Sequence, residues 1–356
     1  MSYRILAINP GSTSTKLAVF DDTAEIFSQS LSHSAEEIGQ FATVIEQMDY
    51  RFNTIMDFLA EKGLTPKNFA AVVGRGGLLK PLISGTYQVG SVMLEDLKSG
   101  RFGSHASNLG AILAQRIAGL AGCPSYIVDP VVVDELDPVA RVSGRPEIKR
   151  KSQFHALNQK AVAKRYAAKL GRRYEDLNLI VAHLGGGISV GCHRLGQVVE
   201  VNNALDGEGP FSPERAGTVQ AGQFAEFILS NRLSLEAVSK QLAGKGGLVA
   251  HLGTTDAREV EARIAAGDEE AQNIYQAMIY NIARYIAAAA VPVKGRVDQI
   301  ILTGGIAYSQ LLTDTIKEYV SFIAPVTVIP GENELQALAE GAYRVLSGEE
   351  QAKEYK

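Results

Sequence analysis

The stretch Asn9-Pro10-Gly11-Ser12-Thr13-Ser14-Thr15-Lys16 places glycine, serine and threonine between two apolar segments. Those segments, 5–9 and 16–20, have the composition of strands, so the stretch is predicted to form the tip of a β-hairpin. Glycine permits positive φ and lets backbone N–H groups converge on an anion, while Lys16 supplies a positive charge. From these residues alone, an anion-binding tip and an ordinary polar turn both remain open.

A second glycine-tipped hairpin follows about half a chain later. Residues 179–184 and 188–193 are predicted strands, Gly185-Gly186-Gly187 is the tight turn between them, and 198–201 is a third strand. The recurrence of this pattern indicates an internal duplication.

Helical patterns surround both hairpins. The first predicted helix begins at Ser34, a capping residue with Glu37 three positions on, and ends at Gly63. Apolar spacing predicts further helices at 104–118, 157–170, 234–243, 257–290 and 334–346, and short buried strands at 69–73, 125–128 and 299–303. The expected fold class is α/β, with duplicated domains of mixed sheets flanked by helices.

The domain boundary is placed from the duplication, because no linker of biased composition divides the chain. The N-terminal domain is expected at 1–150 and the C-terminal domain at 151–335. The C-terminal helix, at about 336–356, is expected to pack back on the first domain.

Two common phosphate-binding motifs are excluded. A P-loop needs Gly-x-x-x-x-Gly-Lys-Ser/Thr leading into a helix, and the chain has no such run. A dinucleotide fingerprint needs a helix after its glycines, but Ile188, Val190 and Cys192 continue as a strand.

The composition limits the partners. A net charge of −4 and a pI of about 5.9 indicate no broad basic surface for nucleic acid or an anionic membrane, so small-molecule partners are expected. Cys123 and Cys192 match no metal or redox spacing and fit buried thiols in a reducing compartment. Without a signal peptide or an apolar stretch that could span a bilayer, a cytoplasmic location is expected.

Two phosphate hairpins in one chain resemble the arrangement of the actin-like ATPase superfamily. Within it, 9–16 resembles the N-A-G-S-S-S-x-K opening of acetate kinases, and 183–189 resembles their H-L-G-N-G-x-S loop. Butyrate kinases are closer still, since they share the opening N-P-G-S-T-S-T-K. This resemblance covers most of the chain and implies that ATP is bound by Asn9, Gly11, Ser12, Thr13, Lys16, Gly185, Gly186 and Gly187.

Two later segments resemble the adenosine site of the same family. Thr303-Gly304-Gly305-Ile306 is similar to its strand-to-helix loop, and Thr255-Asp256-Ala257-Arg258 is similar to its S-D-x-R segment beside the base and ribose. A Gly-Gly turn at the end of a strand lets a flat purine lie against backbone. The resemblance therefore implies further ATP contacts from Asp256, Arg258, Gly304, Gly305 and Ile306, whereas without it plain turns would be the simpler interpretation.

Two arginines are expected to neutralise charge, because phosphoryl transfer needs electrostatic stabilisation and in-line positioning more than covalent help. Arg75, in Val73-Gly74-Arg75-Gly76-Gly77, resembles the arginine of the family's H-R-V-V-H-G-G that binds the substrate carboxylate. Arg215, within 211–217, resembles the second family arginine, which implies a transition-state clamp.

Three histidines and an aspartate complete the implied site. His155 resembles the first histidine of F-H-G-T-S-H, His183 opens the second phosphate loop, and either neutral ring can donate to a phosphoryl oxygen. His105 matches a third family histidine less closely. Asp129 matches the aspartate of F-D-T-A, and it is expected to hold Arg75 or a magnesium-bound water, because an acid substrate is already ionised at pH 7 and needs no general base.

Magnesium is expected to bridge the ATP phosphates, since it prefers hard oxygen ligands. The family's metal-linked glutamate lies in T-N-E-E, whereas this chain has Gly331-Glu332-Asn333-Glu334. Registering on the following leucine puts Asn333 at that position. Glu334 beside it is taken as the candidate metal contact, against the alternative that it simply starts the last helix.

The acid pocket departs from that of acetate kinases. Gly77 replaces the valine two residues beyond the arginine, and Ser104 replaces the leucine of L-H-N-P. If both side chains wall the pocket, as the resemblance implies, their loss opens room for a longer acid, with Phe154 able to refill it. The alternative is that Gly77 only relieves backbone crowding near Arg75.

The resemblance implies the reaction butyrate + ATP = butanoyl phosphate + ADP by direct in-line transfer. Acetate, propionate and branched acids are the alternative substrates. A sugar kinase would need a base for a hydroxyl group, and Arg75 counts against it; a non-catalytic ATP-driven clamp would need a partner-binding segment. The resemblance also implies a homodimer or larger homo-oligomer, formed through the C-terminal domain.

Overall fold

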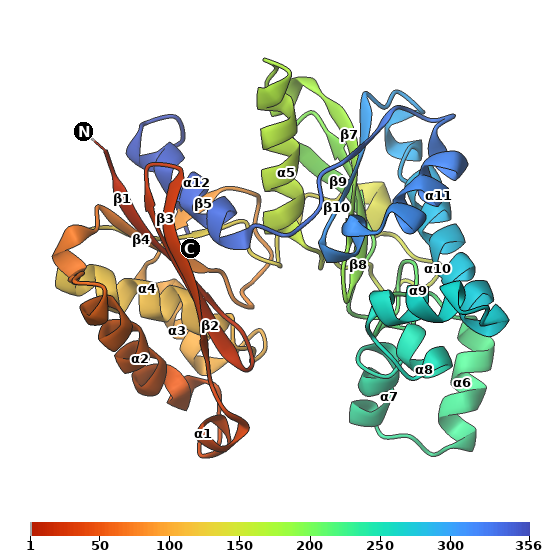
Figure 1. Cartoon of the computed structure of the whole chain (residues 1–356), viewed down its shortest axis with the longest axis horizontal. Helices are drawn as coiled ribbons and strands as arrows, with labels where there is room; N and C mark the ends of the chain where they lie inside the picture. The colour runs from red at the N-terminus through yellow and green to blue at the C-terminus, as the bar shows by residue number, and fades with distance from the viewer. Residues whose placement is uncertain (1) are drawn as a thin grey trace. The chain divides into compact units, whose positions relative to one another are not determined.

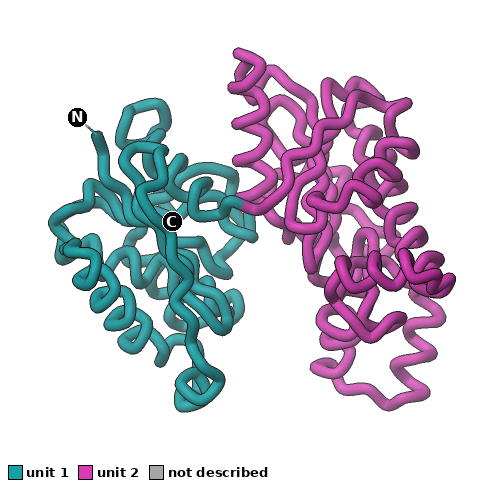
Figure 2. The backbone as a smooth tube through the Cα atoms, viewed as in Figure 1, with its two compact units in different colours: residues 1–133, 333–356 teal, residues 134–332 magenta. Residues whose placement is uncertain are grey.

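The computed structural model describes residues 2–356 and divides the chain into two compact units (Figure 2). Unit 1 comprises the chain up to Val133 together with Asn333–Lys356, and unit 2 comprises Asp134–Glu332. The first boundary therefore comes earlier in the chain than the one expected at residue 150. The second boundary is close to the expected one, and the last helix belongs to unit 1.

Hydrogen bonds and ion pairs explain why 134–150 belongs to unit 2. The Asp137 backbone N–H donates to Val199 O over 2.9 Å. Arg150 pairs with Glu200, its Nη2 lying 2.6 Å from Oε1. These contacts join the segment to the sheet of unit 2. Composition does not reveal them, which is why the sequence placed the boundary too late.

Unit 1 is built on a seven-stranded sheet in the order β12-β5-β6-β4-β1-β2-β3 (Figure 1). β1, β2 and β3 run antiparallel, whereas β4 and β6 lie parallel to β1. The strands are β1 (Arg4–Pro10), β2 (Ser14–Asp21), β3 (Ala24–Ser32), β4 (Ala71–Arg75), β5 (Thr86–Gln88), β6 (Ser125–Val128) and β12 (Lys353–Glu354). The α-helices are α1 (Ala35–Gly39), α2 (Met48–Glu61), α3 (Ser91–Ser99), α4 (Asn108–Ala121) and α12 (Glu334–Leu346).

Unit 2 is built on a five-stranded sheet in the order β11-β10-β7-β8-β9. Its strands are β7 (Asn178–Leu184), β8 (Ile188–Arg194), β9 (Gln197–Val201), β10 (Gln299–Thr303) and β11 (Val326–Val328). Its α-helices are α5 (Ala156–Lys169), α6 (Ala221–Ser230), α7 (Leu235–Leu242), α8 (Leu248–Leu252), α9 (Ala257–Ala265), α10 (Glu269–Ala288) and α11 (Gln310–Val320).

Both sheets repeat one topology, an antiparallel three-stranded run followed by two parallel strands. β3-β2-β1-β4-β6 in unit 1 corresponds to β9-β8-β7-β10-β11 in unit 2. The duplicated α/β architecture predicted from the two hairpins is therefore confirmed.

Parallel strands bring the candidate residues to one edge of each sheet. The carboxyl ends of β1, β4 and β6 carry Asn9, Arg75 and Asp129. The carboxyl ends of β7 and β10 carry His183 and Gly304. Residues far apart in sequence thus gather beside the glycine-rich tip of their own unit, as is usual for binding sites in α/β sheets.

The predicted helices differ from the observed ones mainly by breaks. The capping box of Ser34 and Glu37 is present, but α1 ends at Gly39 and α2 starts only at Met48. The helix expected at 257–290 is likewise divided, because Gly267 adopts a φ of 88° and Asp268 caps the start of α10. Strand β3 was not expected, since its residues are largely exposed and lack a buried apolar stripe.

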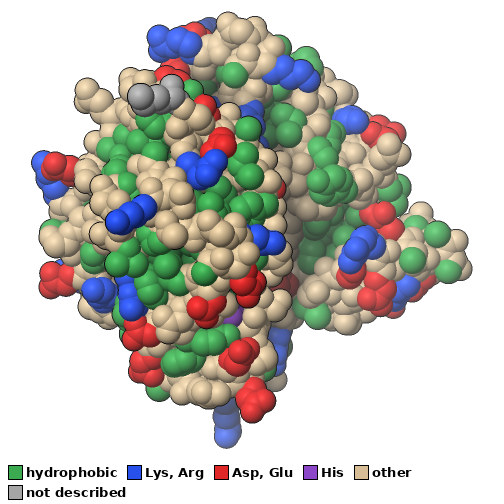
Figure 3. Space-filling view, turned by 60° about the vertical axis from the view of Figure 1, so that its left-hand side comes forward, with side chains coloured by type: hydrophobic (Ala, Val, Ile, Leu, Met, Phe, Trp, Pro, Cys, Tyr) green, Lys and Arg blue, Asp and Glu red, His purple; other side chains and the backbone are tan. Residues whose placement is uncertain are grey.

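On the face drawn in Figure 3, basic and acidic side chains are interspersed, and no wide patch of one sign appears. Within residues 2–356, no helix combines the length and the apolar character that crossing a bilayer would require.

Helix α4 packs unusually close to β4. An ideal Cβ at Gly110 would lie 2.2 Å from the carbonyl oxygen of Arg75, and one at Gly74 would lie 2.1 Å from the carbonyl oxygen of Gly110. Real Cβ atoms do not approach backbone this closely. The two glycines therefore fix α4 against the strand that ends at Arg75, while α12 covers the other side of the same strands (Figure 1).

We expect Gly110→Ala to destabilise the protein by about 1–3 kcal/mol, because the added methyl group must push α4 away from β4. Gly119→Ala on the same helix is the matched control. Nothing lies within 4 Å of a Cβ there, so the substitution should be neutral or stabilising by up to about 1 kcal/mol. Thermal unfolding followed by circular dichroism measures both; equal midpoints for the two variants would contradict the close packing.

Candidate active site

The tip of the first hairpin is held from behind by a buried arginine. Arg51, on α2, donates from Nη1 to Ser14 O over 3.1 Å and from Nη2 to Ser12 O over 3.2 Å. Gln47 Oε1 accepts from the same Nη2 over 2.9 Å. The N–H groups of Ser12 and Thr13 make no hydrogen bond to residues 2–356, and both residues are exposed. The tip thus turns carbonyl oxygens inward and leaves N–H groups for an anion.

Arg51 was not among the residues predicted from the sequence, although it positions the tip. Its signal was a charged side chain within the apolar stripe of α2, next to the buried Phe52 and one turn before the buried Ile55. Burial lowers the pKa of the Arg51 guanidinium, which still has carbonyl and amide oxygens as acceptors. A fully buried arginine is retained only where acceptors compensate its desolvation.

Arg75, Asn9 and Glu334 form a hydrogen-bonded cluster in unit 1. Arg75 Nη1 lies 2.8 Å from Glu334 Oε2 and 3.4 Å from Asn9 Oδ1. Asn9 Nδ2 donates to the same Glu334 oxygen over 2.6 Å. Arg75 makes no other side-chain hydrogen bond within residues 2–356, so its Nε and Nη2 edge can still receive a planar carboxylate. Glu334, chosen from the sequence with a register in doubt, thus lies beside two other predicted residues.

Asp129 does not hold Arg75, contrary to the expectation from the sequence. Its Oδ1 accepts from Ser84 Oγ over 2.6 Å and from the Gly85 N–H over 2.7 Å. The residue adopts a left-handed φ of 37°, which these two bonds stabilise. Glu334 is the carboxylate that pairs with Arg75 in the described chain, and a contact of Asp129 with a magnesium-bound water stays a prediction.

His105 is held in one tautomer beside α4. The Ser107 backbone N–H donates to His105 Nδ1 over 3.2 Å, so Nδ1 carries a lone pair and the neutral ring has its proton on Nε2. Although part of the residue reaches solvent, burial of the ring and the Arg75 guanidinium lower the pKa of His105. The ring can therefore donate one hydrogen bond near Arg75 without carrying a charge.

The Gly77 interpretation does not hold. An ideal Cβ at Gly77 would lie 2.5 Å from Asn108 Oδ1 and 2.6 Å from Asn108 Cα, so it would point into α4 and not into open space. Glycine is required there for close packing. The alternative stated from the sequence, relief of backbone crowding, describes this position better than an enlarged pocket.

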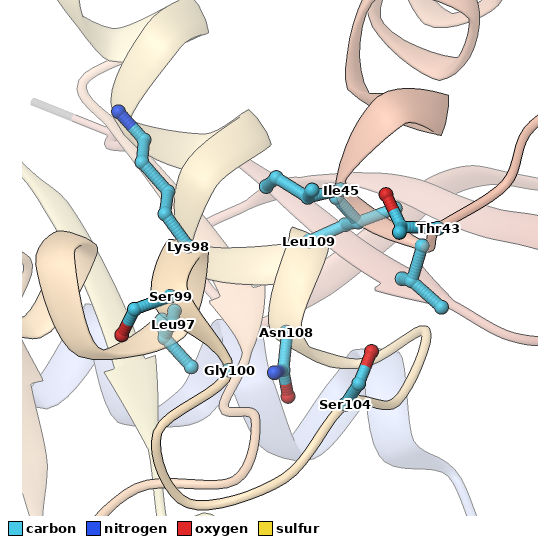
Figure 4. Close-up of a pocket in the computed structure, with 10 residues that line it drawn as sticks. Thr43, Ile45, Leu97, Lys98, Ser99, Gly100, Ser104, Asn108 and Leu109 are labelled. Atoms are coloured by element: carbon cyan, nitrogen blue, oxygen red, sulfur yellow. The ribbon is translucent and has the colours of Figure 1, made fainter.

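Ser104 does line a cavity, shown in Figure 4. The cavity has a volume of about 230 Å³ and lies in unit 1 between 43–45, the end of α3 and the start of α4. Its walls combine the apolar side chains of Val44, Ile45, Leu97 and Leu109 with polar groups. Phe154, the proposed refilling residue, is a buried residue of unit 2.

Arg215 lies against the second hairpin. Its Nη1 donates to Ala204 O over 2.7 Å, while its buried Nε has no partner within residues 2–356. An ideal Cβ at Gly187 would fall 1.9 Å from Nη1, so the turn must have glycine at this position. Burial lowers the pKa of Arg215, with Glu214 acting in the opposite direction. A buried guanidinium with an unsatisfied N–H beside a glycine turn is suited to an incoming anion.

His155 and His183 stack, with 3.8 Å between ring centroids and 9° between ring planes. Asn158 Nδ2 donates to the carbonyl oxygen of Glu332 over 2.9 Å, so its Oδ1 faces His183 Nδ1 at 2.8 Å. His183 therefore carries a proton on Nδ1. Its Nε2 lies 3.5 Å from Glu332 Oε1. The two predicted histidines are thus parts of one packed pair beside the second hairpin.

A cavity of about 810 Å³ in unit 2 collects most of the residues predicted for adenosine. Gly186, Asp256, Arg258, Gly305 and Ile306 line it, joined by Pro213, Glu214, Thr255, Ala257, Glu261, Tyr308 and Ser309. Gly304 is not among the residues that line the cavity. Its φ is 92°, and a Cβ there would lie 2.3 Å from Leu184 O. This glycine is needed to bring the loop after β10 against β7.

A polar cluster beside this cavity was not predicted from the sequence. Glu261 Oε1 accepts from Tyr275 Oη over 2.6 Å and from Ser309 Oγ over 2.5 Å. Burial, followed by the bond to Glu261, raises the pKa of Tyr275. Glu261 follows Arg258 by three residues on α9, a spacing that puts both on one helix face, and this was the available signal.

The partly exposed Asp256 and the exposed Arg258 form an ion pair at the cavity rim. Arg258 Nη2 lies 2.6 Å from Asp256 Oδ2, and Asp256 also caps α9. The side-chain bond to Arg258 is the main cause that lowers the pKa of Asp256 to about 2. The rim therefore presents both an acceptor and a planar cation, which can serve ribose hydroxyls and a base, respectively.

Comparison with known proteins identifies a family and close relatives of this chain. The model of the acetokinase family matches residues 144–324. Butyrate kinase 2 of Clostridium acetobutylicum is 54% identical over 356 residues, covering 100% of both chains. Butyrate kinase 1 of the same organism is 56% identical over 354 residues, covering 99% of this chain and 100% of its own.

The fold is shared with solved structures of the same group. The acetate kinase of Porphyromonas gingivalis has a TM-score of 0.76 at 18% identity, covering 96% of this chain and 99% of its own. At that identity the likeness concerns the fold, and it agrees with the duplicated α/β architecture predicted from the two hairpins. With a family model matched over half the chain and relatives above 50% identity along its whole length, this chain belongs to the acetokinase family.

Proposed function

We propose that this protein transfers the γ-phosphoryl group of ATP to the carboxylate of butyrate, forming butanoyl phosphate and ADP. The observation that carries the proposal is Arg75, whose Nη1 is fixed by Glu334 while its other edge remains available to a planar acid. The printed names of two relatives above 50% identity supply butyrate as the acid. Acetate, propionate and branched acids are the alternatives within the same reaction.

The proposed mechanism needs no general base. A short fatty acid has a pKa of about 4–5 and is ionised at pH 7, so its oxygen can attack the γ-phosphorus directly. Arg75 and His105 would hold the carboxylate, and Arg215 would neutralise charge on the moving phosphoryl. His155 would donate a hydrogen bond to one of its equatorial oxygens, and His183, whose Nδ1 proton is used by Asn158, would donate from Nε2 only when its ring carries both protons. A sugar kinase would leave the Arg75 cluster without a carboxylate to bind.

The two glycine hairpins would hold the phosphates of ATP. The free N–H groups of Ser12 and Thr13, with Lys16, supply donors in unit 1, and the 185–187 turn supplies them in unit 2. The cavity lined by Asp256, Arg258 and Gly305 would receive the adenosine.

Magnesium fits the residues at the first tip. Glu334 Oε2 accepts from Asn9 and Arg75, whereas its Oε1 accepts no hydrogen bond from residues 2–356. A carboxylate oxygen in this position suits Mg²⁺ or one of its waters. The ion would neutralise the phosphates of ATP, and Glu334 would orient it, with Asp129 as a second candidate for a metal-bound water.

Assembly and location are parts of the same proposal. Family likeness supports a homodimer or larger homo-oligomer formed through unit 2. A cytoplasmic location fits an enzyme whose partners are ATP and a small acid. An ATP-driven clamp without transfer chemistry is disfavoured because Arg215 and the histidine pair lie beside the phosphate turn.

The decisive experiment incubates the protein with ATP, magnesium and one acid at a time, from acetate to branched five-carbon acids. Hydroxylamine traps any acyl phosphate as a hydroxamate, which is measured as its coloured ferric complex. We expect product with butyrate at the highest kcat/KM and with propionate at a lower value. Absence of product with every acid would contradict the proposal.

We expect Arg215→Ala to lower kcat by about 10³-fold or more, because it removes charge used chiefly in the transition state. Gly187→Ala should lower kcat as well, although it removes no charge, since its methyl group displaces the guanidinium. Arg75→Ala should in addition raise the KM for butyrate. Steady-state kinetics measure all three.

The matched control for these arginines is Arg145→Ala, which removes an exposed guanidinium paired with Glu147. Its kinetics should equal those of the unmodified protein. Values within about threefold of that level for Arg75→Ala or Arg215→Ala, in folded protein, would refute the assigned roles.

We expect Ser104→Leu to lower the butyrate to acetate ratio of kcat/KM by about tenfold, because leucine fills space that two methylenes would use. Ser91→Leu, an exposed position outside the cavity of Figure 4, is the control and should keep the ratio. Gly77→Val is not a usable companion, since it would collide with α4. An unchanged ratio in Ser104→Leu would remove Ser104 from the pocket.

A further inference from the structure

A continuous chain of hydrogen bonds runs from the core of unit 2 to His155. It can be oriented from one fixed point, the backbone carbonyl oxygen of Ser189, which can only accept. Gln159 Nε2 lies 3.0 Å from that oxygen and 2.8 Å from Ser189 Oγ. The amide nitrogen of Gln159 must therefore face Ser189, and its two hydrogens are used there.

The orientation of Gln159 fixes the tautomer of the next residue inward. Gln159 Oε1 lies 3.0 Å from His193 Nε2, and an amide oxygen can only accept, so His193 carries its proton on Nε2. Burial and the nearby Lys160 lower the pKa of His193, so the ring is neutral. Its Nδ1 then accepts from Tyr174 Oη over 2.6 Å.

The hydrogen-bond partners of Ser189 likewise determine which nitrogen of His155 carries the proton. Ser189 Oγ accepts from Gln159 Nε2 and from the His155 backbone N–H, at 2.8 and 3.4 Å. Both lone pairs of the hydroxyl are then used. Ser189 is fully buried, and its hydroxyl hydrogen has one further neighbour, His155 Nδ1 at 2.9 Å. The hydroxyl must donate to Nδ1, which leaves the ring proton on Nε2.

We propose that Gln159 and Ser189 are positioning residues that hold His155 as the Nε2–H tautomer, so that this ring presents a fixed donor to the transferred phosphoryl group. The consequence of this tautomer for catalysis rests on the proposed function. A phosphoryl oxygen accepts hydrogen bonds, so the ring nitrogen that faces it must carry a proton. The inference concerns the proton of His155 and not the presence of His155 in the site.

Two neighbouring features agree with this relay. Gly191, on β8, leaves the space that the amide needs, since a Cβ there would lie 2.6 Å from Gln159 Oε1. His183, stacked on His155, is fixed by Asn158 in the opposite tautomer with its proton on Nδ1. Two stacked imidazoles in one unit are thus distinguished by their hydrogen-bond partners. Of these two stacked rings, His155 is the one that its partners force to be a donor at Nε2 while neutral.

The test is nitrogen NMR of the full-length protein labelled with ¹⁵N-histidine, which distinguishes Nδ1–H from Nε2–H rings. The chain has six histidines, and His155→Asn identifies the signal of His155. We expect the Nε2–H form in the unmodified protein. In Gln159→Met the hydroxyl of Ser189 is released, so a mixture of both tautomers should appear and kcat should fall about tenfold or more with little change in the KM for butyrate.

Gly191→Ala supplies a second variant that removes no polar group and should shift the His155 tautomer in the same direction. Tyr166→Phe is the matched control, because it removes another partly buried hydroxyl reached from α5, the one bonded to Gln299. Its spectrum and kcat should stay unchanged. An Nδ1–H ring in the unmodified protein overturns the inference, and so does a loss of kcat in Gln159→Met without a change of tautomer. Because the spectrum needs no substrate, failure of the acid kinase assay would not be mistaken for failure of the relay.

Discussion

Close approach of backbone, possible only where no Cβ intervenes, is the constraint on which both units depend. At Gly110 it brings α4 onto the strand that ends in Arg75, and at Gly304 it brings the loop after β10 onto β7. At Gly187 it admits the Arg215 guanidinium to the turn itself. Guanidinium groups can therefore lie close to backbone N–H groups, because no side chain separates them. Together they concentrate positive potential where an anion would bind.

Polar side chains hold in place the groups that these glycines allow close to the backbone. Arg51 turns two carbonyl oxygens of the first tip inward, and Glu334 holds one nitrogen of Arg75. In unit 2, Asn158 and Gln159, adjacent on α5, orient the stacked histidines in opposite senses. Arg51, Asn158 and Gln159 are buried, Glu334 is partly buried, and all four are hydrogen-bonded, so the groups facing substrate would need little rearrangement on binding.

Much of the fold was predictable because its signals are local. Both hairpins, the capping box at Ser34 and the buried strands at 69–73, 125–128 and 299–303 follow from glycine, capping residues and apolar spacing, whereas α3, α6, α11 and β11 were not predicted. The boundary near residue 150 failed because ion pairs such as Arg150–Glu200 decide it, and they join residues distant in sequence. Strand β3 was not predicted, because an exposed strand has no buried apolar stripe in its sequence.

The site was predictable where a residue belongs to a motif, and obscure where its role depends on geometry. Arg75, Arg215, His155 and His183 stand in quoted motifs, whereas Arg51 and Glu261 occupy helix positions that give no such signal. Gly77 shows the converse error. The missing side chain suggested a larger pocket, but a Cβ at Gly77 would point into α4. The sequence alone does not tell where a side chain points.

Unit 1 is discontinuous, since its sheet begins with the first strand and is completed by Asn333–Lys356 after the whole of unit 2. During synthesis, the Arg75 side chain therefore leaves the ribosome long before Glu334, its ion-pair partner. At about 5–20 residues per second, some tens of seconds at most separate the two. Through that interval the first sheet lacks its α12 cover and its β12 edge. Unit 2 is continuous in sequence and precedes Glu334, so the Arg75–Glu334 ion pair can form only after the whole of unit 2 has been synthesised.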